Sequence, residues 1–462
     1  MDLLDINDLK DKIKKAGAKW EANFDPDSNP IHRLDKQARK RLAGAVKPAG
    51  YQTPARVTKK AVDTSTLPSK IDWRDNNGDF VTPVKFQGLC PICSAFGTSA
   101  VMEARIAIEH QQLVELSEAD EFFCSAHGPN CTEASWPLNL LQENKERGIC
   151  QEILFPYPSA YSVADLSEEF PEDLSNPKNM IEATKIAPKC IISPMRDDNA
   201  FKYSEIITIT DLDATKEYLA KIGPISAVMK LYDDILEYQS GIYTHVHGES
   251  SGNHVICIVG YNDADGGYYI CKNSWSEHWG MDGYFNIAYG ECNIDENEKV
   301  GVKGITLPKI ILNYYKCLGT DVNAKYLYLD GIAKNGSVNL CADTNAYSNP
   351  GTYWEEQQLS DGSVALKCMG TTEKSDFVYL DGNTQDGSVG LAANTDSDNS
   401  GTHWQKEQLS DGSTAFKCLN TTGNSDFVYL DGHTKDGTVG LAPNTDSSYS
   451  GTHWEKNGFT SS

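Results

Sequence analysis

Cys93 begins a stretch whose residue types are suited to nucleophilic chemistry. The residues from Ala95 to Gln112 contain no proline and carry apolar side chains at mixed three- and four-residue spacing, which predicts an amphipathic helix. The N–H groups at the start of such a helix carry partial positive charge, which, with a nearby imidazolium, lowers the pKa of a thiol. We therefore predict that Cys93 is a nucleophilic thiolate. Gln87 is predicted to donate its side-chain N–H to a developing oxyanion beside the backbone N–H of Cys93.

His254 and Asn273 are the predicted partners of this thiol. His254 precedes the apolar run 256–259, and Asn273 follows a second strand-like run, 268–271. Two adjacent strands would bring both side chains to the same end of one sheet. His254 would then take the thiol proton and return it to the leaving amine. Asn273 would orient the imidazole ring, and Trp275 would shield that hydrogen bond from water.

The order of these groups resembles that of the papain family of cysteine peptidases. The resemblance covers about residues 67–308 and implies an α+β, two-lobed fold with a helical left lobe and a β-barrel-like right lobe. It implies a cysteine endopeptidase that hydrolyses peptide bonds through Cys93, His254, Asn273 and Gln87. The family usually has Gly-Ser before the cysteine and Trp after it. The motifs that carry the resemblance are Gln87, Cys93-Ser94-Ala95-Phe96, Asn253-His254, Asn273-Ser274-Trp275, Trp279-Gly280 and Gly283-Tyr284, with departures at Pro91-Ile92 and Ser94.

The resemblance also implies where a peptide substrate binds. Glu133 and Ala134 replace part of the Gly-Gly pair that binds substrate backbone in the family, so a narrower and more acidic wall is expected. The segment 292–298 resembles the floor of the S2 pocket, whose preference stays open between apolar and basic side chains. No long His-containing insertion precedes Trp136, which favours an endopeptidase. The predicted substrate-binding residues are Glu133, Ala134, Val228, Val255, Trp275 and Asn297.

The cysteines fit the family's disulfide pattern in part. The resemblance implies a bridge between Cys90 and Cys131, and Cys124 is expected to pair with Cys190 or Cys150. A bridge requires an oxidising compartment, so a secreted or lysosome/vacuole-like location is expected. The first residues lack the basic and apolar lead of a signal peptide, so either the chain is intracellular or a leader has been removed. Buried free thiols are expected at Cys257, Cys271 and Cys292.

Residues 1–66 resemble a self-inhibitory prosegment. The segment 20–24, Trp-Glu-Ala-Asn-Phe, is similar to the prosegment signature of cathepsin-B-like members of the family. The resemblance implies an extended part that lies through the cleft in the reverse of the substrate direction. Residues 1–70 carry 15 Lys and Arg against 9 Asp and Glu, a net charge of about +6. The whole chain carries −24, so this basic segment precedes an acidic body of about −30. An N-terminal docking arm without inhibitory function is the alternative.

Residues 309–462 contain a threefold repeat. Tyr-Leu-Asp-Gly recurs from residues 328, 379 and 429, and Trp354, Trp404 and Trp454 recur every 50 residues. Short strands with Asp-Gly turns, together with the run 310–315 that can supply the strand missing at the other end, predict a closed β-trefoil. The tryptophans are predicted to be core residues, and Lys-Cys pairs ending at residues 317, 368 and 418 predict a threefold layer of core thiols.

The trefoil is predicted to bind a glycan or to dock a protein. Carbohydrate would bind through acidic, amide and imidazole groups that recur in the second and third repeats, although the Gln-x-Trp signature of ricin-type trefoils is absent. These candidates are Asp381, Asn394, His403, Asp431, Asn444 and His453.

Composition limits the partners of the whole chain. The net charge of −24 argues against nucleic acid and anionic membrane surfaces, and no apolar run is long enough to span a bilayer. No metal and no cofactor are expected; the expected partners are peptide or protein substrates, the chain's own prosegment and a trefoil ligand. The sequence thus predicts a cysteine endopeptidase zymogen that a trefoil targets. The competing hypothesis is a trefoil binding protein whose peptidase-like part is an inactive scaffold.

Overall fold

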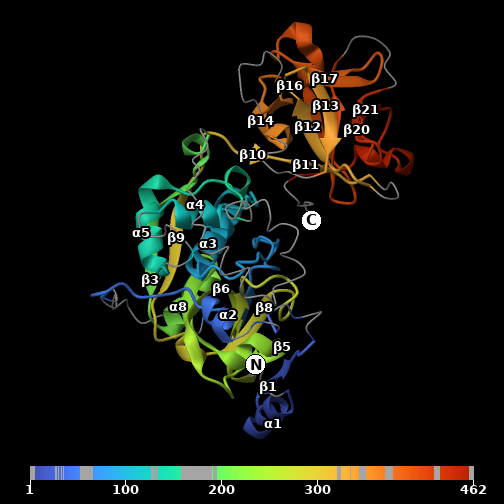
Figure 1. Ribbon diagram of the computed structural model, residues 1–462. Coiled ribbons are helices and arrows are strands. Elements are labelled where there is room, and N and C mark those ends of the chain that lie inside the picture. The colour runs from blue at the N-terminus through green and yellow to red at the C-terminus, as the bar shows by residue number, and fades with distance from the viewer. Residues whose placement is uncertain are drawn as a thin grey trace. The chain divides into compact units, whose positions relative to one another are not determined.

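The computed structural model divides the chain into two compact units, Met1–Leu307 and Pro308–Ser462 (Figure 1). The structure describes residues 6–25, 29, 31–32, 34, 36–52, 66–125, 131, 134–157, 190, 195–319, 324–332, 334–342, 350–369, 378–420 and 427–456.

Helix α3 (Cys93–His110) is the central helix of the first unit. Its residues from Cys93 to Ala107 are all buried, so the helix is enclosed rather than amphipathic as predicted. Gln111 ends it in the left-handed conformation, with φ of 55°. Helices α4 (Glu118–Phe123) and α5 (Pro137–Arg147) pack against α3 (Figure 1). Ser117 caps α4 by accepting a hydrogen bond from the backbone N–H of Asp120 at 2.8 Å.

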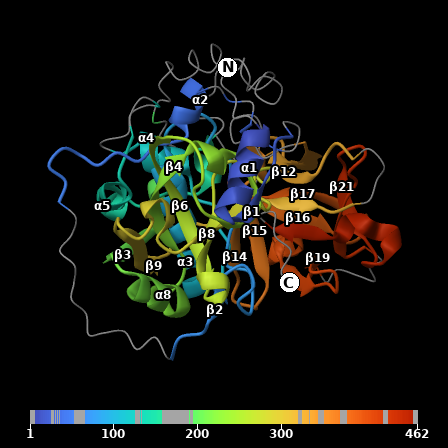
Figure 2. The same ribbon diagram turned by 90° about the horizontal axis from the view of Figure 1, so that it is seen from below.

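The described residues of the first unit also form a nine-stranded sheet with the order β1-β5-β8-β7-β6-β4-β9-β3, to which β2 adds by pairing with β6. Strands β4 and β6 lie side by side (Figure 2), and β6 packs on α3. Helix α8 (Leu212–Lys221) lies between β3 and β4 in the sequence. The strands are β1 (Lys19–Ala22), β2 (Lys70–Asp72), β3 (Lys202–Ile209), β4 (Ile225–Tyr232), β5 (Tyr238–Tyr243), β6 (Ser250–Asn262), β7 (Tyr268–Lys272), β8 (Tyr284–Ala288) and β9 (Lys299–Thr306).

The N-terminal segment joins this sheet through β1. It comprises α1 (Ile6–Ala16), β1 and α2 (Lys36–Arg41). Trp20 pairs with Gly241 of β5 and is buried against the rings of Tyr238 and Tyr243. A side chain at Gly241 would meet the Lys19 carbonyl oxygen at 2.2 Å, so this close approach requires glycine. The segment around the predicted signature is thus part of the core of the first unit.

The second unit consists of strands that pair in two closed rings. In the first ring, the hairpins β14–β15 and β18–β19 and the pair β22–β11 are linked to one another by β15–β18, β19–β22 and β10–β14. In the second, the hairpins β12–β13, β16–β17 and β20–β21 meet through β13–β17, β17–β21 and a bridge between Asn339 and Thr438. Figure 1 shows β12, β13 and β17 side by side.

Three equivalent tryptophans fill the centre of this unit. Trp354, Trp404 and Trp454 are fully buried, and each indole N–H donates to a backbone carbonyl 24 or 25 residues earlier at 3.0 Å. They are core residues, as predicted. The strands are β10 (Leu312–Asn313), β11 (Tyr315–Cys317), β12 (Tyr328–Ile332), β13 (Ser337–Cys341), β14 (Trp354–Gln358), β15 (Val364–Cys368), β16 (Tyr379–Asn383), β17 (Ser388–Ala392), β18 (Trp404–Gln408), β19 (Thr414–Cys418), β20 (Tyr429–Gly432), β21 (Val439–Ala442) and β22 (Trp454–Lys456).

Candidate active site

Cys93 is the first residue of α3, and its thiol is fully buried against β6. The backbone N–H of Val255 in β6 donates to the Cys93 Sγ at 3.4 Å. The residue before Val255 is His254, so the packing of α3 on β6 brings the predicted nucleophile and base to adjacent positions. The two residues are 161 positions apart in the sequence, and the packing of α3 on β6 brings them together.

The imidazole of His254 is oriented by Asn273. Strands β6 and β7 are antiparallel, with Cys257 opposite Lys272, so both residues lie at the same end of the sheet. The Nε2 atom of His254 lies 2.8 Å from the Asn273 Oδ1, and this oxygen also accepts the backbone N–H of Ser274 at 2.9 Å. The buried indole of Trp275 stacks on the imidazole at a centroid distance of 4.7 Å, where it covers the hydrogen bond.

Gln87 links the loop before α3 to the loop after β7. Its Oε1 accepts the hydroxyl of Ser274 at 2.7 Å, its Nε2 donates to the Cys90 carbonyl at 3.1 Å, and its backbone N–H donates to the Ser274 carbonyl at 2.9 Å. The side chain is therefore fixed beside the N-terminus of α3. An amide nitrogen carries two N–H groups, so one remains for a substrate oxygen.

Residues 41–45 of the N-terminal segment occupy the space in front of Cys93. The guanidinium of Arg41 donates to the Leu89 carbonyl at 2.9 Å and to the Cys131 carbonyl at 3.1 Å. The backbone N–H of Ala45 donates to the Asn253 carbonyl at 3.2 Å. A Cβ on Gly44 would lie 2.0 Å from the Pro91 carbonyl oxygen. The segment therefore contacts both walls of the site, and Gly44 sits where no side chain fits.

Burial sets the charge state of this covered pair. It raises the pKa of the Cys93 thiol to about 11 and lowers the pKa of His254 to about 4. The expectation of a lowered thiol pKa is wrong for this state. The reason is that the helix N-terminus and the Val255 N–H stabilise a thiolate less than loss of water destabilises it. Burial thus favours the neutral thiol and the neutral imidazole, whereas the two oxygen acceptors that face the ring nitrogens, Asn273 Oδ1 and the Leu42 carbonyl, favour the protonated ring.

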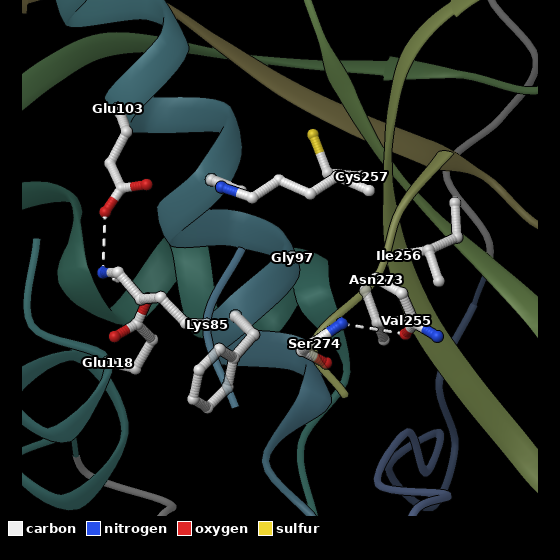
Figure 3. Close-up of a pocket in the computed structure, with 12 residues that line it drawn as sticks. Lys85, Gly97, Glu103, Glu118, Val255, Ile256, Cys257, Asn273 and Ser274 are labelled. Atoms are coloured by element: carbon white, nitrogen blue, oxygen red, sulfur yellow. Dashed lines mark hydrogen bonds and ion pairs between the residues drawn. The ribbon is translucent and has the colours of Figure 1, made fainter. Parts of the chain in front are cut away.

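A buried cluster of charges lies behind the site, and sequence reasoning missed it. Figure 3 shows Lys85 beside Glu103 and Glu118, with Asn273 bonded to Ser274 on the other side of α3. The Lys85 ammonium lies 3.0 Å from Glu103 and 2.9 Å from Glu118. Burial raises the pKa of Glu118 to about 7. The only sequence signal is that Ser117-Glu118 starts a helix, which gives no information about burial.

The predicted substrate-binding residues are brought together in part. Val228 and Val255 are cross-strand partners of β4 and β6, and the side-chain amide of Asn297 donates to the Val228 carbonyl at 3.5 Å. Ala134 is half-buried, whereas Glu133 lies outside the described residues.

A second buried contact of the N-terminal segment lies at Glu298. The phenol of Tyr51 and the indole of Trp136 both donate to the Glu298 Oε1, the indole at 2.5 Å. The two rings lie 5.8 Å apart, and the Lys47 ammonium lies 4.8 Å from the Trp136 ring. The carboxylate is buried, and no motif in the sequence predicts an aromatic pair above it.

Two disulfides connect the loops around the site. Cys90 is bonded to Cys131, and Cys124 is bonded to Cys190, which decides between the two predicted partners of Cys124. Cys150 is instead a buried thiol. The thiols of Cys257, Cys271 and Cys292 are also buried and unbridged.

The predicted sugar-binding histidines of the second unit form hydrogen bonds to other residues of that unit. The Nδ1 of His403 lies 2.6 Å from the Asp361 Oδ2, and its Nε2 lies 3.0 Å from the Thr395 carbonyl oxygen. His453 repeats this arrangement with Asp411 at 2.7 Å and Thr445 at 3.1 Å. Both imidazoles therefore link one repeat to the preceding turn.

The other predicted sugar ligands also have internal contacts. The Oδ1 atoms of Asn394 and Asn444 each accept a backbone N–H two residues on, at 3.0 Å. The carboxylate of Asp381 lies against the backbone of Gly401, and that of Asp431 lies against Gly451, as the positions of a Cβ at those glycines show. The recurrence of these residues thus has a structural explanation in each repeat.

Comparisons with known proteins agree with the geometry of the first unit. Residues 67–302 match the papain family cysteine proteases, and the chain belongs to this family. Mouse pro-cathepsin H is 30% identical over 236 residues, which cover 49% of this chain and 62% of that protein. The cathepsin B-like cysteine proteinase 6 of Caenorhabditis elegans is 26% identical over 326 residues, which cover 65% of this chain and 83% of that protein. The chain thus spans less than two thirds of the length of pro-cathepsin H.

A solved structure shares the fold of the first unit. Procathepsin B S9 from Trypanosoma congolense superposes with a TM-score of 0.53 at 22% identity, covering 66% of this chain and all of that one. The fold is therefore papain-like, with mixed α and β content. In the part of the chain that the structure describes, no helix has the length and apolarity needed to cross a membrane.

Proposed function

We propose that this chain is the zymogen of a cysteine endopeptidase that acts through Cys93, His254 and Asn273. The observation that carries the proposal is the 2.8 Å contact between His254 Nε2 and Asn273 Oδ1, made beside the thiol at the start of α3. This contact leaves Nδ1 of the same ring as the nitrogen for proton exchange. Membership of the papain family of cysteine proteases supports the same chemistry.

The reaction follows from the positions of these groups. Once the cleft is open, the Cys93 proton passes to His254 Nδ1, and the thiolate attacks the carbonyl carbon of the peptide. The oxyanion receives hydrogen bonds from the Gln87 side chain and the Cys93 backbone N–H. The carbon–nitrogen bond then breaks, and the amine leaves with the proton from His254. Water, activated by the same imidazole, hydrolyses the thioester and regenerates the thiol.

We assign residues 1–66 as the inhibitory prosegment of this zymogen. Support comes from the Arg41, Leu42 and Ala45 contacts on both sides of Cys93 and from β1, which is anchored in the core by Trp20. The disulfides favour an oxidising compartment, secreted or lysosome-like. Proteins and peptides are the proposed substrates. The prosegment has to be cleaved off before them, because its removal opens the cleft.

A Cys93-directed covalent inhibitor tests the enzyme assignment. Processed protein is expected to be labelled at Cys93 and to cleave peptides, whereas the Cys93→Ala variant is expected to do neither. If processed wild-type protein with intact disulfides is not labelled at acidic or neutral pH, the first unit is an inactive scaffold. The chain would then be a binding protein that acts through its second unit.

We further propose that residues 309–462 form a β-trefoil that targets the peptidase to a glycan or a protein. The two closed rings of strand pairs and the three buried tryptophans support this assignment. Full-length Cys93→Ala protein on a glycan array is the test. Binding that disappears when the second unit is altered would support targeting by glycan, and a blank array would favour protein docking.

A further inference from the structure

One layer of the strand barrel in the second unit carries three charged side chains, one of them 16% exposed and the other two about 40% exposed. In each of β14, β18 and β22 the first residue is the buried tryptophan, and the residue two positions later lies on the same face of the strand. These residues are Glu356, Lys406 and Lys456. Their cross-strand partners, all buried, are Leu366, Phe416 and Tyr315.

The three charged side chains converge on one point. The ammonium groups of Lys406 and Lys456 lie 2.9 and 3.2 Å from the Glu356 Oε2. The phenol of Tyr315 donates to the Glu356 Oε1 at 2.6 Å. Although burial raises the pKa of Glu356, the two ammonium groups lower it more, to about 2. The carboxylate is therefore ionised at any pH of interest, and the layer carries a net charge of +1.

A cavity of about 190 Å³ opens onto this layer. A water molecule in the liquid takes about 30 Å³, so the cavity accommodates several waters or one small organic molecule. The Gln408 amide donates to the Gly412 and Ser413 carbonyls and is already engaged. The ammonium groups each have three N–H donors and use one on Glu356, so they remain available to a ligand. The cavity is lined by Tyr315, Glu356, Lys406, Gln408, Thr414, Phe416 and Lys456.

The charge balance of the layer indicates what the cavity binds. An ion pair in a partly buried site is often no more stable than apolar residues of the same volume, and an excess charge adds a desolvation cost. Burial lowers the pKa of Lys456, although Glu356 opposes the shift. One added negative charge would neutralise the layer, whereas a dianion would leave an excess negative charge beside Glu356.

We propose that this end of the barrel is a binding site for a small monocarboxylate, whose carboxylate bridges the ammonium groups of Lys406 and Lys456. A free organic acid and the terminal acidic sugar of a glycan present the same group. The site is independent of the peptidase chemistry, so it stands whether or not Cys93 is a nucleophile. It also lies apart from the Asp, Asn and His side chains that the sequence singled out in the same unit.

Calorimetric titration of the full-length Cys93→Ala protein tests the proposal. The probes are acetate and glucuronate, with glucose as the neutral control and sulfate as the dianion, all at constant ionic strength. We expect saturable binding of acetate or glucuronate, and none of glucose. Tighter binding of glucuronate than of acetate would identify the acidic sugar as the source, and equal binding would identify the free acid.

Four variants separate this site from a general charge effect. Lys406→Met removes one bridging ammonium and is expected to weaken binding at least ~10-fold, which corresponds to about 1.4 kcal/mol, whereas Lys406→Arg is expected to retain it. Lys417→Met removes a charge from β19 outside this layer and is expected to leave binding unchanged. Glu356→Gln raises the layer charge to +2 and is expected to admit sulfate. Thermal unfolding establishes that each variant is folded.

Any of four results would overturn the proposal, and the first three concern the carboxylate probes, Lys406→Met and sulfate. These are the absence of saturable binding to either carboxylate, equal affinity of folded Lys406→Met and the parent protein, and tighter binding of sulfate than of glucuronate to the parent. An equal loss in Lys417→Met would also overturn it, because binding would then depend on the net charge of the unit.

Discussion

The carbonyl oxygen of Leu42 lies 3.0 Å from Nδ1 of His254, the ring nitrogen opposite the one that contacts Asn273. This is the nitrogen that has to exchange a proton with the Cys93 thiol in the proposed reaction. The Leu42 carbonyl thus occupies the hydrogen-bonding position at Nδ1 of the proposed base, and the same N-terminal segment fills the space in front of the thiol. Burial raises the pKa of the Cys93 thiol, so in this arrangement the segment also disfavours the thiolate.

The first prediction concerns thiol reactivity before processing. With a pKa of about 11, roughly one Cys93 in a thousand is a thiolate at pH 8. The zymogen is expected to react with iodoacetamide far more slowly than the processed protein, measured by mass spectrometry of the Cys93 peptide. The zymogen of Cys93→Ala gives the background from other thiols. Equal rates in zymogen and processed protein would contradict a buried, protonated thiol.

The second prediction concerns Gly44. In Gly44→Ala the new Cβ would overlap the Pro91 carbonyl oxygen, 2.0 Å away. Overpacking of this kind costs about 1–3 kcal/mol, so the prosegment is expected to bind roughly 10–100-fold more weakly. Faster maturation in a gel time course is the readout. Val46→Ala, an exposed position in the same segment, is the matched control and is expected to mature like the wild type.

The third prediction separates the roles at the active site. Cys93→Ala is expected to abolish turnover while retaining the fold, because it removes the nucleophile and little volume. Asn273→Ala is expected to retain partial activity, because ring orientation is only one contribution. Gln87→Ala is expected to lower kcat by about 10²–10³, the usual cost of one oxyanion donor. Kinetics on a peptide substrate measure all three, and equal loss in Cys93→Ala and Asn273→Ala would contradict the assigned roles.

The fourth prediction is that the first unit is more stable in acid than in base. Burial raises the pKa of Glu121 to about 8, although the hydroxyls of Thr98 and Ser99, each 2.7 Å away, oppose the shift. An acid whose folded pKa lies above its unfolded value stabilises the fold at low pH and loses that contribution as the pH rises from about 4.5 to 8. The unfolding temperature of Cys93→Ala protein is expected to fall over this range, and the fall is expected to be smaller in Glu121→Gln.

The fifth prediction is that acid triggers maturation. Carboxylates of the acidic body are protonated towards pH 4, while the Lys and Arg of the prosegment keep their charge. One contact adds to this effect. The Lys12 ammonium donates to the His247 Nδ1 at 2.7 Å and to the Asp8 carboxylate at 2.7 Å, so α1 is joined to the body of the first unit by a charged side chain.

Processing at several pH values tests the acid trigger. The wild type is expected to mature faster at pH 4 than at pH 8 in low salt. Mixing wild type with Cys93→Ala distinguishes cleavage between molecules from cleavage within one. Equal rates at pH 4 and 8 would show that packing, or another protease, controls release.

The order of residues along the chain predicted the groups of the candidate site, the helix that starts at Cys93 and the repeated core of the second unit. The Gln87, Cys93, His254 and Asn273 motifs predicted the site groups because nucleophilic chemistry requires particular residue types in a particular order. The absence of proline after Cys93 predicted a helix whose described range, Cys93–His110, is close to the expected one. The 50-residue recurrence of tryptophan predicted three equivalent core positions, because a repeat that closes on itself buries the same side chain each time.

Tertiary packing decided what residue order left open. The direction of the Cys93 pKa depends on how much water the N-terminal segment excludes, and a motif contains no information about that exclusion. The partner of Cys124 depended on which loop returns to it, 66 residues later, rather than on spacing. His403 and His453 recur like ligands, yet they are bonded within the fold. Glu356, Lys406 and Lys456 look like ordinary surface charges in the sequence and meet only because three strands close a barrel.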